Sequence, residues 1–144
     1  MTYTAIRNII EAKVVALGGV YYSGELQDLG RLVEKLNSDD VVFLNEVSDQ
    51  NTDVLVNLSG GMKNRLNFRF YILQNHKGDL SEYQLDAYYS MAITNGNKLV
   101  ASLINHDGNN LEIESAQIRR LKMKSPNLFA GGLLTFSLRI RGEC

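Results

Sequence analysis

The segment RLNFRFYIL, residues 65–73, has the clearest period of two in the chain. Successive side chains of a strand point to opposite faces of a sheet. The apolar set faces one side and comprises Leu66, Phe68, Phe70 and Ile72. The other side receives Asn67, Arg69 and Tyr71. One buried face and one wetter face are typical of an antiparallel sheet.

Further strands are predicted on both sides of this segment. VVFLNEV at 41–47 and DVLVNL at 53–58 precede it. LLTFSLRIR at 133–141 repeats the alternation near the end of the chain, and residues 111–123 contain two extended pieces, LEIES and IRRLKM. VYY at 20–22 is a shorter β-like piece.

Three helices are predicted. Residues 2–17 place apolar side chains at spacings of three and four, and Gly18-Gly19 ends that helix. Residues 25–37 form a second helix with Gly30 in its middle. Residues 81–105 form a third, which Ser81 and Gln84 begin as a capping box and which Asn95-Gly96-Asn97 is expected to break or kink.

The resulting order is α-α-β-β-β-α-β-β. Segregated helices and strands predict an α+β fold in which helices pack against an antiparallel or mixed sheet. A length of 144 residues corresponds to a single domain over 1–144.

Composition narrows the functional class. The formal net charge of −1 gives no overall field for nucleic acid or membrane. The start, MTYTAIRNII, lacks the apolar region of a signal peptide, and no run reaches the ~18 apolar residues of a membrane span. The single cysteine, Cys144, excludes an internal disulfide. We therefore expect a cytoplasmic protein, or part of a particle assembled there, with no membrane partner.

Residues 57–65, NLSGGMKNR, resemble the signature loop of ATP-binding-cassette ATPases. That loop binds phosphate at the start of a helix, whereas the residues that follow here have the period of a strand. A GxxxxGK[ST] phosphate loop is also missing. We interpret the stretch as the glycine-rich turn of a β-hairpin between 53–58 and 65–73.

Candidate catalytic chemistry is sparse. His76 and His106 both lie in polar, turn-like contexts without other metal ligands at useful spacing. No nucleophile, base and orienting group occur together in the sequence. We therefore expect no catalytic residues, no metal, no cofactor and no enzymatic activity.

The C-terminal part of the chain is basic. Residues 1–60 contain nine acidic and four basic residues, whereas residues 115–142 contain six basic residues and no acidic ones. The basic residues are Arg119, Arg120, Lys122, Lys124, Arg139 and Arg141. They form either a solvated face or a surface that contacts DNA or a partner protein.

The element order resembles the tail terminator and tail-completion (head–tail joining) proteins of long-tailed bacteriophages. The segments that carry the resemblance are TYTAIRNIIEAKVVAL, RLNFRFYIL followed by SEYQLDAYYSMA, and the closing LFAGGLLTFSLRIRGEC. The resemblance implies a homo-oligomeric ring, commonly a hexamer, that caps the tail tube, joins it to the head connector and lets DNA pass through its lumen. Its partners would be other virion proteins, its location the virion, and it would have no catalytic residues.

Other functions stay open from the sequence. The basic segment also fits an accessory nucleic-acid-binding module, whose DNA binding would depend steeply on salt. A head–tail adaptor or a tail-tube protein is close to the leading interpretation. A small enzyme would need a deep, polar pocket built from residues far apart in the sequence.

Overall fold

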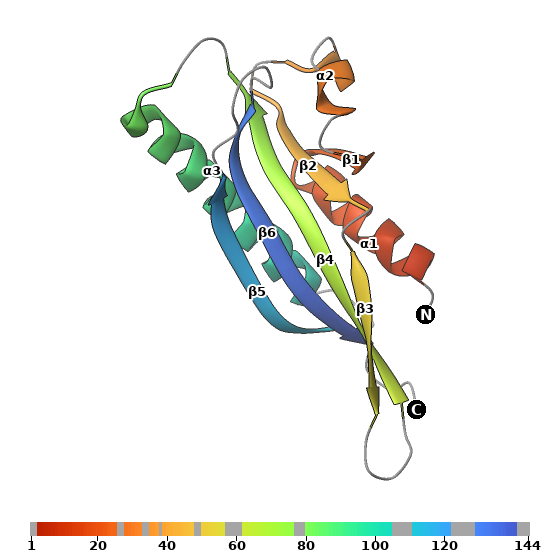
Figure 1. The fold of residues 1–144 in the computed structure, drawn as a ribbon. Coiled ribbons are helices and arrows are strands. Elements are labelled where there is room, and N and C mark those ends of the chain that lie inside the picture. The colour runs from red at the N-terminus through yellow and green to blue at the C-terminus, as the bar shows by residue number, and fades with distance from the viewer. Residues whose placement is uncertain are drawn as a thin grey trace.

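The chain forms a six-stranded mixed sheet with two long helices packed against one face, in a computed structural model (Figure 1). The structure describes residues 3–25, 28–32, 35–37, 39–47, 50–56, 62–76, 80–104, 111–121 and 129–140. The predicted α+β class is confirmed.

The elements follow one another in a simple order. They are α1 (Tyr3–Ala16), β1 (Val20–Gly24), α2 (Leu29–Leu32), β2 (Val41–Glu46), β3 (Asn51–Val56), β4 (Met62–Asn75), α3 (Glu82–Ile104), β5 (Leu111–Leu121) and β6 (Phe129–Ile140).

The sheet has the strand order β1-β2-β4-β6-β5, and β3 also pairs with β4. β4 is long enough to bind two strands along one edge: β2 pairs with its second half and β3 with its first half. β1 runs parallel to β2, whereas all other pairs are antiparallel. The hairpin of β3 and β4 continues past the Arg65–Arg139 pair that ends the β4–β6 ladder, so it projects from the sheet (Figure 1).

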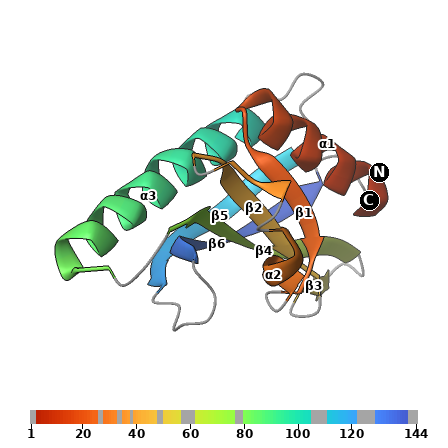
Figure 2. The same ribbon diagram turned by 90° about the horizontal axis from the view of Figure 1, so that it is seen from above.

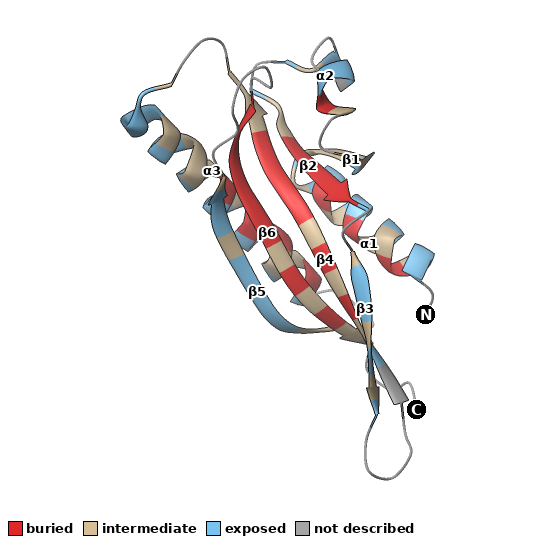
Figure 3. Cartoon of the chain, viewed as in Figure 1, coloured by how far each residue is buried: buried red, intermediate tan, exposed pale blue. Residues whose placement is uncertain are grey.

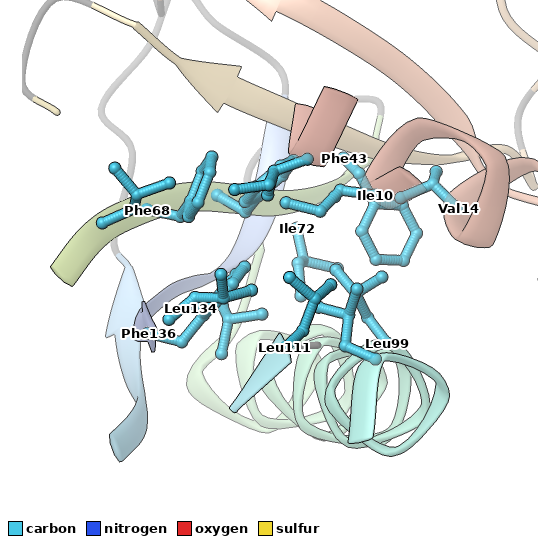
Figure 4. Packing of buried hydrophobic residues seen from close by; sticks show 14 of the residues in the cluster. Ile10, Val14, Phe43, Phe68, Ile72, Leu99, Leu111, Leu134 and Phe136 are labelled. Atoms are coloured by element: carbon cyan, nitrogen blue, oxygen red, sulfur yellow. The ribbon is translucent and has the colours of Figure 1, made fainter. Parts of the chain in front are cut away.

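The two faces of the sheet are covered differently. α1 and α3 lie on one face and the short α2 lies on the other (Figure 2). The main core lies under α1 and α3, and includes Ile10, Phe43, Phe68, Leu99 and Leu134 (Figure 4). The aromatic rings stack within this core, because the centroid of Phe136 lies 5.3 Å from that of Phe68 and 6.0 Å from that of Phe70.

A second apolar cluster lies under α2. Leu29 of α2 is fully buried there, and the cluster members are Leu29, Val42, Leu44, Tyr71, Leu73, Phe129 and Leu133. β2 is therefore buried on both faces, which explains its continuous apolar sequence. The predicted strand at 41–47 is confirmed.

A chain of side-chain hydrogen bonds connects α1 to the first two strands. The hydroxyl of Tyr3 donates to Oε1 of Gln50 at 2.6 Å, and Nε2 of Gln50 donates to Asn45. Nδ2 of the fully buried Asn45 then donates to the hydroxyl of Tyr21 at 2.9 Å. Burial raises the pKa of Tyr21, and the bond from Asn45 opposes that rise. Both polar ends of Asn45 are thus satisfied inside the core.

Several predicted details are confirmed. α1 ends at Ala16, and Gly18 follows with a φ of 82°, the left-handed conformation that ends many helices. The backbone N–H of Ser81 donates to Oε1 of Gln84 at 2.9 Å, and the N–H of Gln84 donates to the hydroxyl of Ser81 at 3.3 Å, which is the predicted capping box. β3 and β4 form the predicted hairpin, although its turn, 57–61, lies outside the described residues.

The predicted break at Asn95-Gly96-Asn97 is wrong, because α3 is continuous from Glu82 to Ile104. Gly96 is buried against the sheet, where an added Cβ would lie 2.8 Å from Cδ1 of Ile118 and 3.2 Å from Cδ1 of Ile72. The glycine therefore permits close packing of the helix on the sheet. This packing outweighs the free-energy cost of a glycine inside a helix, which is up to ~1 kcal/mol.

Other predicted boundaries also differ from the structure. The described residues of 25–37 are α-helical only at Leu29–Leu32, where Leu29 is fully buried. The short piece at 20–22 joins the sheet as β1, and the two extended pieces of 111–123 are one strand, β5. The turn predicted at 106–110 lies outside the described residues.

None of the helices in the described ranges combines the length and the apolar character that crossing a bilayer requires.

We expect Gly131→Ala to lower the free energy of unfolding by about 2–3 kcal/mol, the cost of overpacking a tight core. A Cβ at this position would lie 1.9 Å from the carbonyl oxygen of Ile72, a backbone atom of the neighbouring strand. Gly30→Ala is the matched control, since no atom lies within 4 Å of its added Cβ. Urea denaturation measures both, and equal midpoints for Gly131→Ala and wild type would contradict this account.

Candidate partner-binding surfaces

The face of the sheet opposite α1 and α3 becomes polar where α2 no longer covers it. We call this part the open face. Its residues are Asn51, Asp53, Arg65, Asn67, Arg69, Glu114, Ser115, Gln117, Thr135, Ser137 and Arg139. They come from β3, β4, β5 and β6, and the alternation of each strand directs them to one side, except that Glu114 reaches it from a bulge in β5.

Asp53 is the centre of the first polar network on the open face. Its Oδ2 accepts hydrogen bonds from Nε of Arg65 at 3.0 Å, from Nη2 of Arg65 at 2.8 Å and from Nδ2 of Asn67 at 3.0 Å. The bond from Asn67, followed by those from Arg65, lowers the pKa of Asp53. The hydroxyl of Ser137 donates to Oδ1 of Asn67 at 2.7 Å, which extends the network to β6.

Glu114 joins the two arginines at the edge of this network. Its Oε1 lies 2.5 Å from Nη2 of Arg139, and its Oε2 lies 3.5 Å from Nη1 of Arg65. The pairing of β5 with β6 shifts between Ile113 and Ser115, so Glu114 is the extra residue of a bulge. Glu112 lies opposite Arg139 in the ladder of β5 and β6. The bulge directs a second acidic side chain, that of Glu114, toward the open face near Glu112.

A third polar group lies where the open face meets the cluster under α2. Burial raises the pKa of Tyr71, and the hydrogen bond of its hydroxyl with Glu46 raises it further, whereas the bond with Arg69 lowers it. Glu46 is only 6% exposed. A buried carboxylate of β2 that is bonded to the hydroxyl of Tyr71 on β4 favours a structural role for this group.

A shallow groove of about 420 Å³ crosses the open face. Arg69 is the only ionisable side chain among its described lining residues, which otherwise carry amide, hydroxyl and apolar groups. Ser115 and Ser137 have no histidine or carboxylate in that lining to activate them. In the described parts of the chain, no three His, Cys, Asp or Glu side chains are grouped as metal ligands.

The structure separates the basic residues that the sequence groups together. Arg119 is exposed on β5 and, among the described residues, forms no ion pair. Arg120 binds Asp86 of α3 and lies 4.9 Å above the ring of Tyr89. Arg139 is bound to Glu114. Their role as DNA-facing or partner-facing residues stays a prediction, and Lys122, Lys124 and Arg141 lie outside the described residues.

An apolar groove of about 500 Å³ lies between α3 and β5, on the other face of the sheet. We call it the edge groove. It is lined by Tyr89, Ile93, Asn97, Val100, Ala101 and Ile104 of α3, by Ala116 and Ile118 of β5, and by Leu134. Ile93 and Ile104 are 37% and 52% exposed. The outer side of β5 has no strand against it among the described residues, and most of β5 is exposed (Figure 3).

The opposite edge of the sheet also exposes apolar side chains. Val54 and Val56 of β3 are 59% and 69% exposed, far more than is usual for valine. Neither the exposure of these valines nor the edge groove is predicted from the sequence. Val54, Leu55 and Val56 form a continuous apolar run. A run without polar residues does not show which of its side chains face solvent, so the exposure of the two valines could not be predicted from it.

No model of a known protein family matches this chain, and no curated protein is detectably similar to it in sequence.

We expect Asp53→Asn to destabilise the protein at pH 7 and to matter less as the pH falls. The pKa of Asp53 lies below its usual 3.8 in the folded state, so its stabilising effect is complete above about pH 4 and is lost as the pH falls through the folded pKa.

Urea denaturation of wild type and variant at pH 7 and near pH 2.5 measures this effect. Glu11→Gln, an exposed charge on α1 outside the network, controls for the loss of one negative charge. If the difference in free energy of unfolding between Asp53→Asn and wild type is the same at both pH values, the network does not depend on the ionised carboxylate.

Proposed function

We propose that the chain is a non-enzymatic structural subunit of a phage tail or neck, similar to a tail terminator, which assembles head to tail into a homo-oligomeric ring. Such a ring would cap the tail tube and join it to the head connector. The observation that carries the proposal is that the sheet has open edges on both sides, with strands from the acidic segment of the chain on one side of β4 and strands from the basic segment on the other.

The open edges support association between sheets. β5 forms one edge, and β1 and β3 form the other, without a further described strand outside them. An edge strand presents unpaired N–H and C=O groups, which natural proteins usually cover or protect with charge. Joining one edge strand of each side in successive copies leaves neither of these two strands open when the rotation between copies closes a ring.

The charges of the two flanks support a head-to-tail contact. The acidic part of the chain, 1–60, supplies α1, β1, α2, β2 and β3, which lie on one side of β4. The basic part, 115–142, supplies most of β5 and all of β6 on the other side. Complementary potentials steer association and suppress contacts between like flanks.

The projecting hairpin of β3 and β4 also suits a subunit with partners above or below its ring. The backbone of Met62, Lys63 and Asn64 pairs with β3 alone, so this part extends beyond the ladder that holds the rest of the sheet (Figure 1). A neighbouring ring or the connector is the partner that we assign to it.

Arg119 is the residue that we assign to DNA or to an acidic partner surface, with Lys122 and Lys124 close to it in sequence. Its charge is exposed and, within the described residues, not neutralised by an acid. The same observation favours the second candidate function, an accessory nucleic-acid-binding module.

Negative-stain imaging and light scattering of the concentrated protein test the ring. We expect closed particles whose mass is a small multiple of 16.1 kDa, and we expect them to dissociate as salt is raised because the flanks attract electrostatically. A chain that stays monomeric at all concentrations, and binds DNA with a steep salt dependence, would instead support the nucleic-acid module.

We expect replacement of Arg119, Arg120 and Lys122 together by Ser to impair assembly or DNA retention. The fold should persist, because the exposed ion pair of Arg120 with Asp86 is worth only about 0–1 kcal/mol. The matched control replaces three exposed basic residues elsewhere, Arg31, Lys35 and Lys98, by Ser. Equal assembly and DNA retention in both triple variants would show that the position of the charge on β5 has no role.

A further inference from the structure

We propose that the contact between neighbouring subunits is an antiparallel pairing of β3 of one copy with β5 of the next, in which Val54 and Val56 enter the edge groove. This inference rests on the proposed ring and specifies its interface. The partner of the edge groove is thus a second copy of this chain.

The first surface is the outer edge of β3. Thr52 pairs with Leu66, which is buried in the main core, so Thr52 faces the side of the sheet that α1 and α3 cover. Val54 and Val56 follow at steps of two and therefore face the same side. Their exposure leaves two apolar side chains beside a backbone edge with no described strand against it.

The second surface is the outer edge of β5 with the edge groove beside it. Ala116 and Ile118, which line the groove, are spaced by two on β5, as Val54 and Val56 are on β3. Ile93 and Ile104 of α3 are exposed large apolar side chains on the opposite wall. A strand added to β5 would therefore place alternate apolar side chains against α3, as in other β-strand additions.

Strand direction and facing agree with this pairing. β3 is antiparallel to β4, whereas β5 is parallel to β4 because two antiparallel pairings separate them. In a neighbouring copy of the same orientation, β3 thus runs antiparallel to β5. The sheet continues without turning over, so the face that bears Val54 and Val56 becomes continuous with the face that bears the edge groove.

A second copy is the occupant because each chain carries both edges and the charge differs between its two parts. β3 lies in the acidic part of the chain, although its own acid, Asp53, is bound to Arg65, and β5 carries the exposed Arg119 beyond its two acidic residues, Glu112 and Glu114. Each copy has one surface of each kind, on opposite edges of its sheet. Their contact is heterologous, which is the geometry that generates rings.

The first experiment compares Val54→Asp combined with Val56→Asp against Val15→Asp. Val15 of α1 is 62% exposed, so it controls for the loss of an exposed valine and the gain of a charge. We expect the double variant to shift the mass from that of the ring to 16.1 kDa, and the control to keep the mass of the ring. Circular dichroism should show that both are folded, since neither change touches the core.

The second experiment detects the contact directly. Cys144 is replaced by Ser, and one protein with Val56→Cys is mixed with another that carries Ala116→Cys, followed by oxidation. We expect a disulfide-linked dimer of twice the chain mass in the mixture, at least tenfold more abundant than in either protein alone. A mixture with Val15→Cys in place of Val56→Cys should show no such product.

The outcomes separate the interface from the ring. If the double aspartate variant forms the same rings as wild type and the mixture gives no cross-link, the pairing of β3 with β5 is wrong and the proposed ring is unaffected. If the wild-type chain stays monomeric and the mixture gives no cross-link, both the proposed ring and this interface are wrong. If the double variant loses the rings and the mixture forms the cross-link, the results support both the ring and the pairing of β3 with β5.

Discussion

The pairing of β4 with β6 is the interaction on which the rest of the structure depends. The two strands are matched from Arg65 opposite Arg139 to Asn75 opposite Phe129, and every other strand except β1, which pairs with β2, is attached to one of them. Phe68, Phe70 and Phe136 stack across this pair on the face toward α1 and α3. Because a strand directs alternate side chains to opposite faces, fixing this register fixes both the core and the open face at once.

The open face is polar but largely neutralised within the subunit. Asp53 of β3 and Glu114 of β5 bind Arg65 of β4 and Arg139 of β6, so these ion pairs connect four strands. The hydroxyl of Ser137 also donates to Asn67. These contacts stabilise the register where the helices do not cover the sheet. They also leave little free charge in the middle of this face.

The candidate surfaces could be predicted only in part. The sequence shows the basic segment, but it does not show which of its arginines form ion pairs. Arg120 meets Asp86, and Arg139 meets Glu114, only after the chain has folded. The edge groove combines side chains of α3 with those of β5, which pack together although they are distant in sequence. The exposure of Val54 and Val56 depends on β3 having a strand on one side alone, which is a property of the sheet and not of the segment.

The sequence by itself determined the features that depend on near neighbours in the chain. The period of two in 65–73 specified the central strand, Gly18 the end of α1, and Ser81 with Gln84 the start of α3. Only the tertiary structure decided the continuity of α3 through Gly96, the shortness of α2 and the entry of β1 as a parallel strand. Each of these depends on packing between distant segments, whose energies exceed the local preference of a glycine or of a short apolar run.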